Sequence, residues 1–304
     1  MAVGRGPGRM GSGLGIDDRH RRTGAAMDRI SAIQIERNRQ TRDAWQRFSR
    51  HRGRVTDSLL EIVPRPGSRL CVLGAGNCND LDLPRLLAAY PSVTLVDLDR
   101  DAVESGVRRQ GLSLTGAGIT ALAPVDLCDL DPESAPIDAL ARNSGSSVSA
   151  GVPTGHGAAA ADSGFDVVLS ACVLSQLIDG LRRKHGEGRG SGDSEVLAAR
   201  TAHLRLIAGE LRPGGVGVLI SDFVSGDTAP ALVTAADEEL PGLAVDLIRD
   251  GNFFTGTNPA AAARCLLTEL PRATSVRLLD PPAFWRWDLG PRTYLVYRLR
   301  FRRL

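Results

Sequence analysis

The sequence predicts an α/β protein with a doubly wound, mostly parallel sheet covered by helices on both faces. The first observation is that short apolar runs alternate with segments of helical periodicity from residue 69 onward. The second is that Gly, Pro, Asn and Asp separate these segments. The third is that the last two predicted strands have no helix between them, which indicates an antiparallel end to the sheet.

The composition is that of an ordinary globular chain. It has 304 residues, of which 42% are hydrophobic and 24% charged, with a net charge of +2. No run approaches the ~20 apolar residues that a bilayer span needs, and the N-terminus has no apolar core of a secretory signal. We therefore expect a cytoplasmic protein without a membrane segment. Five cysteines without a CxxC pair predict neither a metal site nor a disulfide framework.

The amino-terminal part of the chain differs from the rest. Residues 1–25 are predicted to be a disordered Arg/Gly-rich tail, and residues 26–63 carry helical spacing. Residues 1–54 hold 13 Arg against 5 acidic residues. Such an arm could bind nucleic acid, but no nucleic-acid recognition motif accompanies it, so a solvated basic surface is the simpler interpretation and a nucleic-acid partner is not expected.

Residues 64–304 are predicted to form one domain. Its first half should contain a strand in "SRLCVLG", a glycine turn, and a helix in "DLDLPRLLAAY". A second strand in "VTLVDLD", a helix in "RDAVESGVRRQG" and a third strand in "GITALAPVDL" follow. A low-complexity stretch near 141–164 is too polar and small-sided to pack, so it is predicted to be a flexible insertion.

The second half resumes the alternation. "FDVVLSACVLSQL" predicts a strand and the start of a helix, and a second flexible insertion near 185–194 precedes the helix "EVLAARTAHLRLIAGEL". The turn "RPGG" feeds the strand "VGVLISDF", and Asn258 with Pro259 predicts a capped helix start. The strands "SVRLLD" and "TYLVYRLRF", on either side of a tryptophan-bearing loop, bring the total to seven.

The turn in "RLCVLGAGNCNDLDL" carries the strongest chemical signal. Gly74 and Gly76 match the start of a GxGxxG phosphate-binding turn, but Asn79 stands at the third glycine. Asp80 would repel a phosphate there. Asp97 follows Gly76 by 21 positions at the end of the next strand, where a carboxylate binds a ribose diol. These residues favour a cationic, adenosine-like ligand without a pyrophosphate, a description that S-adenosylmethionine meets.

Residues 50–304 resemble the class I S-adenosylmethionine-dependent methyltransferases. "CVLGAGNCND" is similar to the family's first motif, "LVDLD" to the second, "APVDLCDL" to the third and "FDVVLSACVLSQL" to the fourth. "LRPGGVGVLISDF" resembles the turn and fifth strand that follow. Cys78 departs from the pattern, because it stands where the family has a third glycine. The resemblance implies a Rossmann-like, mostly parallel seven-stranded sheet with an antiparallel C-terminal strand.

The resemblance also implies which residues hold the methyl donor. The implied cofactor-binding residues are Gly74, Ala75, Gly76, Asn77, Asp80, Asp97, Leu98, Asp126, Leu127, Ser170 and Ala171. Residues 26–63 would form a helical lid. The family has no universal catalytic residue to transfer, because the donor is already activated and alignment supplies much of the rate.

Five residues are candidates for the acceptor pocket: His51, Ser175, Gln176, Asp222 and Thr255. His51 could act as a base, although an exposed basic helix end is the simpler interpretation. Ser175 and Gln176 follow the fourth strand and Asp222 ends the fifth, where acceptor contacts are common in the family. Thr255 lies in a turn-rich loop of the kind that often binds ligands.

The implied function is methyl transfer to a small-molecule acceptor that the sequence does not identify. One alternative is a nucleic-acid or protein methyltransferase that docks through the basic arm, and another is a non-catalytic nucleotide-binding homologue. An NAD-dependent oxidoreductase is disfavoured by Asn79 and Asp80. The methylated atom and the oligomeric state stay open.

Overall fold

The structure of the chain is a computed structural model. It describes residues 31–62, 64–116, 118–127, 137, 164–185 and 192–304. The predicted tail at 1–25 lies outside the described residues, as do residues 141–163 of the first predicted insertion and 186–191 of the second.

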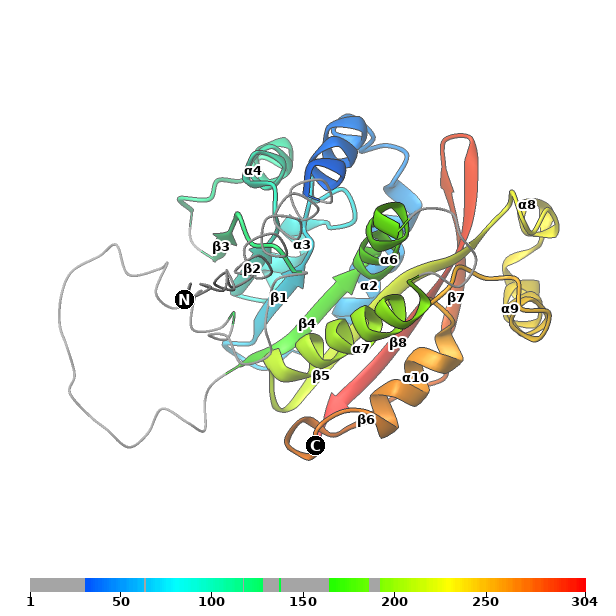
Figure 1. The fold of residues 1–304 in the computed structure, drawn as a ribbon. Helices are drawn as coiled ribbons and strands as arrows, with labels where there is room; N and C mark the ends of the chain where they lie inside the picture. The colour runs from blue at the N-terminus through cyan, green and yellow to red at the C-terminus, as the bar shows by residue number, and fades with distance from the viewer. Residues whose placement is uncertain (1–30, 63, 117, 128–136, 138–163, 186–191) are drawn as a thin grey trace, which may run out of the picture.

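One eight-stranded sheet organises the molecule, with strand order β3-β2-β1-β4-β5-β8-β6 and β7 paired beside β8 (Figure 1). The strands are β1 (Arg69–Leu73), β2 (Ser92–Val96), β3 (Ile119–Leu122), β4 (Phe165–Ala171), β5 (Leu211–Ser225), β6 (Val276–Leu278), β7 (Ala283–Leu289) and β8 (Arg292–Arg303). The first five strands are parallel. β8 is antiparallel to β5, so the predicted Rossmann-like architecture with its antiparallel C-terminal strand is confirmed.

Within the described residues the sheet has eight strands, one more than the seven that the sequence predicts. Both β6 and β7 pair with β8 on the same edge, β6 near its C-terminal end and β7 along the rest. Pro281 and Pro282 separate them, because proline lacks the N–H that a ladder requires. The predicted tryptophan-bearing loop is therefore strand β7, and its alternating residues Trp285 and Trp287 point into the core.

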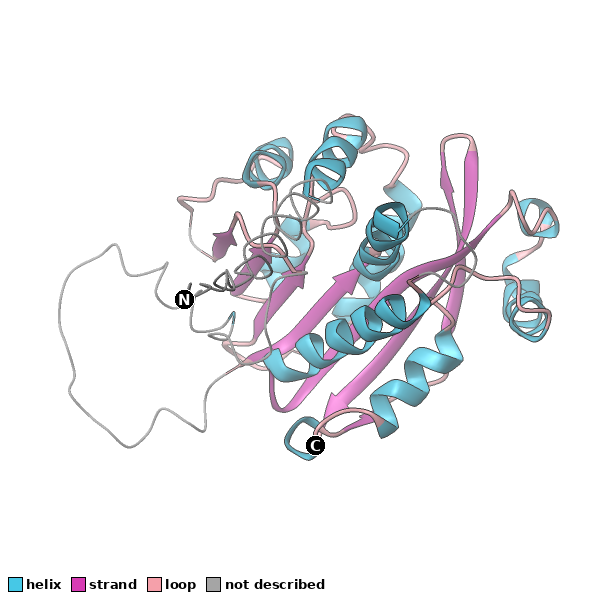
Figure 2. Cartoon of the chain, in the orientation of Figure 1, coloured by secondary structure: helices cyan, strands magenta, loops and turns pink. Residues whose placement is uncertain are grey.

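Helices cover both faces of the sheet (Figure 2). Besides the helical residues 31–41, the described helices are α2 (Ser49–Leu60), α3 (Leu83–Ala89), α4 (Arg100–Arg109), α6 (Val173–His185), α7 (Asp193–Glu210), α8 (Ala231–Thr234), α9 (Leu240–Arg249) and α10 (Pro259–Thr268), with short 3-10 turns η1 (Asp237–Glu239) and η2 (Arg272–Thr274). On one face of the sheet, buried residues of α2, α3 and α4 pack against the strands. On the other face, buried residues of α6, α7, α9 and α10 do so. Alternate residues of each strand supply the two cores, as the period of a strand requires.

The segment predicted as one N-terminal helical unit is two helices. Residues 31–41 are helical, a run of turns follows, and α2 begins at Ser49. Arg52 lies over the ring of Trp45 at 3.4 Å and donates to the carbonyl of Trp45 at 2.9 Å, which fixes the turns against α2. Within the described part of the chain, no helix combines the length and apolar character that crossing a bilayer requires.

Candidate functional site

The carboxyl ends of four parallel strands lie side by side, and the end of the sheet that they form is called the carboxyl edge below. Leu73 of β1 lies beside Val96 of β2 and beside Ser170 of β4. Val96 in turn lies beside Leu122 of β3. The turn after β1, Asp97 and the segment after β3 therefore emerge next to one another, at the edge where open α/β sheets bind their ligands.

The turn after β1 takes a left-handed backbone path. Gly74 and Gly76 have φ values of +70° and +47°, which glycine adopts without a steric penalty. A Cβ at Gly74 would lie 2.3 Å from the Cγ2 atom of Val173, so this position has no room for a side chain. Cys78, at the third motif position, also has a positive φ of +51°. This backbone conformation is uncommon for a residue with a side chain, and the thiol of Cys78 is buried.

Asp97 ties the turn to the end of β2. Its Oδ2 atom accepts from the N–H of Gly76 at 2.7 Å, and its Oδ1 atom accepts from the N–H of Asp99 at 2.8 Å. Burial raises the pKa of Asp97, and these backbone hydrogen bonds oppose the rise by stabilising the carboxylate. The carboxylate is fixed in place, and each oxygen keeps capacity for a further donor such as a ribose hydroxyl.

The helical segment 31–41 lies across this edge. Ser31 donates to Asp126 at 3.1 Å, and the Nδ2 atom of Asn38 lies 3.5 Å from Asp97 Oδ1. The side chain of Asn77 donates to the backbone oxygen of Asn38 at 2.6 Å. The segment therefore contacts three of the predicted cofactor-binding residues. Sequence reasoning missed Ser31 and Asn38, because a polar residue in a short helix carries no signal of what it faces in the folded chain.

Two deeply set carboxylates, Asp80 and Asp222, form an acidic pair beside the turn. Burial raises the pKa of Asp80 to about 7, with Arg52 opposing the shift and Asp222 adding to it. The Oδ1 atom of Asp80 is buried and makes no hydrogen bond. Burial also raises the pKa of Asp222, whose Oδ1 atom accepts from Ser175 at 2.5 Å. A buried, partly unsatisfied carboxylate next to a second one favours a cationic ligand.

His51 is not on an exposed helix end, which was the simpler of the two interpretations of the sequence. It is fully buried, stacked on Trp287 with ring centroids 4.3 Å apart. Its Nδ1 atom accepts from Trp285 at 3.1 Å, which places the ring proton on Nε2, 3.6 Å from Asp80 Oδ1. Burial lowers the pKa of His51 to about 3, so its ring stays neutral. The neutral ring of His51 thus lies against Asp80 without a hydrogen bond to it.

The other predicted site residues divide by position. Ser170 is buried and its Oγ atom lies 2.7 Å from Nε2 of His203 on α7, so it belongs to the sheet interior. Gln176 is exposed, and its backbone oxygen accepts from Gln34 at 3.2 Å. Thr255 lies in a loop held to Phe223 of β5 through the N–H of Phe254. None of the contacts in the described residues joins Thr255 to the acidic pair.

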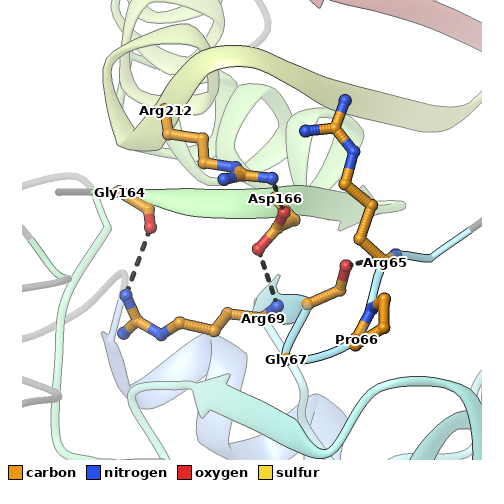
Figure 3. Close-up of a pocket in the computed structure, with 8 residues that line it drawn as sticks. Arg65, Pro66, Gly67, Arg69, Gly164, Asp166 and Arg212 are labelled. Atoms are coloured by element: carbon orange, nitrogen blue, oxygen red, sulfur yellow. Dashed lines mark hydrogen bonds and ion pairs between the residues drawn. The ribbon is translucent and has the colours of Figure 1, made fainter. Parts of the chain in front are cut away.

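A cavity of about 450 Å³ opens at the opposite edge of the sheet (Figure 3). It lies at the amino ends of β1, β4 and β5. Its central carboxylate, Asp166, accepts from the backbone N–H of Arg69 at 2.9 Å and pairs with Arg212. Arg69 also donates to the carbonyl of Gly164 at 3.2 Å. These polar groups largely satisfy one another, so the carboxyl edge is the better candidate site.

No protein-family model matches the chain, and no curated protein matches it either. Solved structures show similarity at low identity. The N-methyltransferase NodS from Bradyrhizobium japonicum WM9, in complex with S-adenosyl-L-homocysteine, is 14% identical over 78% of each chain, with a TM-score of 0.40. A SAM-dependent methyltransferase from Methanosarcina mazei is 14% identical over 81% of this chain and 97% of its own, with a TM-score of 0.44. An O-methyltransferase family protein from Burkholderia thailandensis is 15% identical over 76% of this chain and 50% of its own, with a TM-score of 0.34.

Proposed function

We propose that the chain is an S-adenosylmethionine-dependent methyltransferase that acts on a small-molecule acceptor. The observation that carries the proposal is the composition of the carboxyl edge. The glycine turn and Asp97, a carboxylate placed to bind a ribose, lie where a nucleotide binds. The acidic pair lies where a dinucleotide site would need groups that donate hydrogen bonds to phosphate. An adenosine ligand with a positive charge fits these groups.

The residues of the site fit this donor on three counts. Gly74 and Gly76 carry no Cβ, and their positive φ values give the turn a backbone path of the kind that lets a ligand approach the main chain closely. Asp97 would accept from the ribose hydroxyls. The carboxylate of Asp80, which lies beside His51, would accept from the donor's ammonium. Asp126, which now accepts from Ser31, would face the adenine end.

The donor, when bound, supplies a methyl group on a sulfonium, which already leaves readily. The protein's part is to orient the acceptor and exclude water. We assign orientation to Asp222 and Ser175, whose hydrogen bond joins β5 to the start of α6. Asp222 does not end the fifth strand as predicted, because β5 continues to Ser225. Residues 31–41 act as a lid in this proposal, because Ser31 contacts Asp126 and Asn38 contacts Asp97 and Asn77.

Calorimetry tests the proposal directly. The full chain should bind S-adenosylmethionine and its demethylated product, S-adenosylhomocysteine, and should not bind NAD or NADP under the same conditions. Firm binding of NAD with no binding of the sulfonium compound would overturn it. A labelled-methyl transfer assay on cell extract, fractionated by acceptor size, then separates small-molecule acceptors from nucleic acid and protein.

The acidic pair predicts a pH dependence of donor binding. Because the pKa of Asp80 is raised to about 7, its carboxylate becomes charged only as the pH rises through that value. The affinity for the cationic donor should therefore increase roughly tenfold between about pH 6 and pH 8. Calorimetry across this range checks the slope. Asp80→Asn should flatten it, and an equally steep curve in that variant would show that another group titrates.

A docking arm for nucleic acid receives less support from the described residues. Arg50 and Arg54 both pair with Asp237, at 2.5 and 3.3 Å. Arg37 pairs with Asp179. Among the described residues, these three arginines are thus already paired within the fold, which leaves them less available to neutralise a phosphate backbone.

A further inference from the structure

A groove of about 510 Å³ runs between α7 and α10, on a part of the molecule that the proposed function does not use. The two helices lie side by side on one face of the sheet (Figure 1). Arg200, Thr201 and Arg205 of α7 line the groove, together with Arg264 of α10 and Glu269. It shares no residue with the glycine turn or the acidic pair.

Arg200 is the unusual residue of this groove. Its side chain is only 7% exposed, and its Nε atom is buried without a hydrogen-bond partner. Among the ion pairs of the described residues, none includes Arg200. A buried charge is normally paired, because an unpaired one loses its hydration without compensation. Arg200 is therefore available to pair with an anion from outside the chain.

Glu269, the acidic residue of the groove, is already engaged. Its Oε2 atom accepts from Thr201 at 3.2 Å and from the thiol of Cys265 at 3.4 Å. Its backbone oxygen accepts from Arg205 at 3.1 Å. Arg264 is exposed, and its guanidinium has no partner among the described residues. Three guanidinium groups and one carboxylate leave the groove with a formal charge of +2.

We propose that this groove is a binding site for the phosphate group of a small molecule, held between Arg200 and Arg264. A phosphate dianion matches the surplus charge of the groove, whereas a single carboxylate would balance only half of it. The planar guanidinium presents two parallel N–H donors, which suit two oxygens of one phosphate. The hydroxyl of Thr201 is at the same wall of the groove and can turn from Glu269 toward the ligand.

The test compares wild type with Arg200→Met, which keeps an unbranched apolar side chain as far as the position of Nε and removes the charge. Titration calorimetry uses inorganic phosphate and glycerol 3-phosphate at constant ionic strength, so that the free ion and a phosphoester are distinguished. Wild type should bind at least one of them, and Arg200→Met should weaken that binding at least tenfold. The matched control is Arg249→Met on α9, whose arginine is 68% exposed and paired with Asp246, and it should bind as wild type does.

Thermal unfolding separates this role from a structural one. In phosphate-free buffer, Arg200→Met should unfold at the same temperature as wild type or higher, because it removes an unpaired buried charge. Phosphate should raise the midpoint of wild type and of the control but not that of Arg200→Met. No binding of either probe to wild type, equal binding by Arg200→Met, or a midpoint for this variant well below wild type in phosphate-free buffer would each overturn the proposal. Binding of S-adenosylmethionine should be unchanged in Arg200→Met, so the two proposals fail independently.

Discussion

Replacing Asp97 with Asn should weaken binding of S-adenosylmethionine at least tenfold, a loss of about 1.4 kcal/mol. The carboxylate now accepts from two backbone N–H groups, of Gly76 and Asp99. An amide can accept from only one of them and turns its own N–H₂ group toward the other. The turn would open at one end, and the charge that strengthens a hydrogen bond to ribose would disappear.

The same substitution should lower the free energy of unfolding by about 1–3 kcal/mol, because a buried N–H loses its acceptor. Denaturant unfolding measures the change in the free energy of unfolding, and calorimetry measures the change in affinity for S-adenosylmethionine. Asp101→Asn is the matched control: it removes the same charge from an exposed position in the first turn of α4. The control should change donor affinity less than twofold. An unaltered dissociation constant for Asp97→Asn would refute the role assigned to Asp97.

The order of elements and the parallel sheet could be predicted because each signal is local. A strand followed by a glycine turn, or Asn258 before Pro259, is visible within a few residues. The cap is present as expected, since Asn258 accepts from the N–H of Ala260 at 2.9 Å. The broken edge strand was harder to predict: "DPPAFWRWDLG" contains two prolines, and nothing in it shows that β7 pairs with β8 immediately after them.

The site could be predicted only in part, for a physical reason. The positions after β1 and β2 follow from strand register, so Gly76 and Asp97 are close whatever else the chain does. The environment of His51 depends on Trp285, which is 234 residues away. A charge count of the arginine-rich segment suggests an exposed helix end, whereas the tertiary contacts place this ring in the core. Long-range packing of this kind leaves no local pattern.

Replacing either of two helical glycines with alanine should change the free energy of unfolding, in opposite directions at the two positions. The pair of variants tests how the packing of α4 supports the glycine turn. Gly106 lies in α4 and Gly242 in α9. In a helix, glycine is less favourable than alanine by roughly 0.5–1 kcal/mol. Gly242 is exposed and has open space around it, so Gly242→Ala should raise the free energy of unfolding by about that amount.

Gly106→Ala should instead lower the free energy of unfolding by about 1–3 kcal/mol. A Cβ at Gly106 would lie 2.2 Å from the backbone oxygen of Asn77 and 3.0 Å from the Cβ atom of Cys78, both within the turn. A rotamer change cannot move either atom away, because one belongs to the backbone and the other is bonded directly to it. The helix α4 and the turn must therefore move apart to make room for the new methyl group. Donor affinity should fall with stability in this variant and stay unchanged in Gly242→Ala. Wild-type affinity in a destabilised Gly106→Ala would mean that the donor does not bind against this turn, since the displaced backbone of Asn77 is part of it.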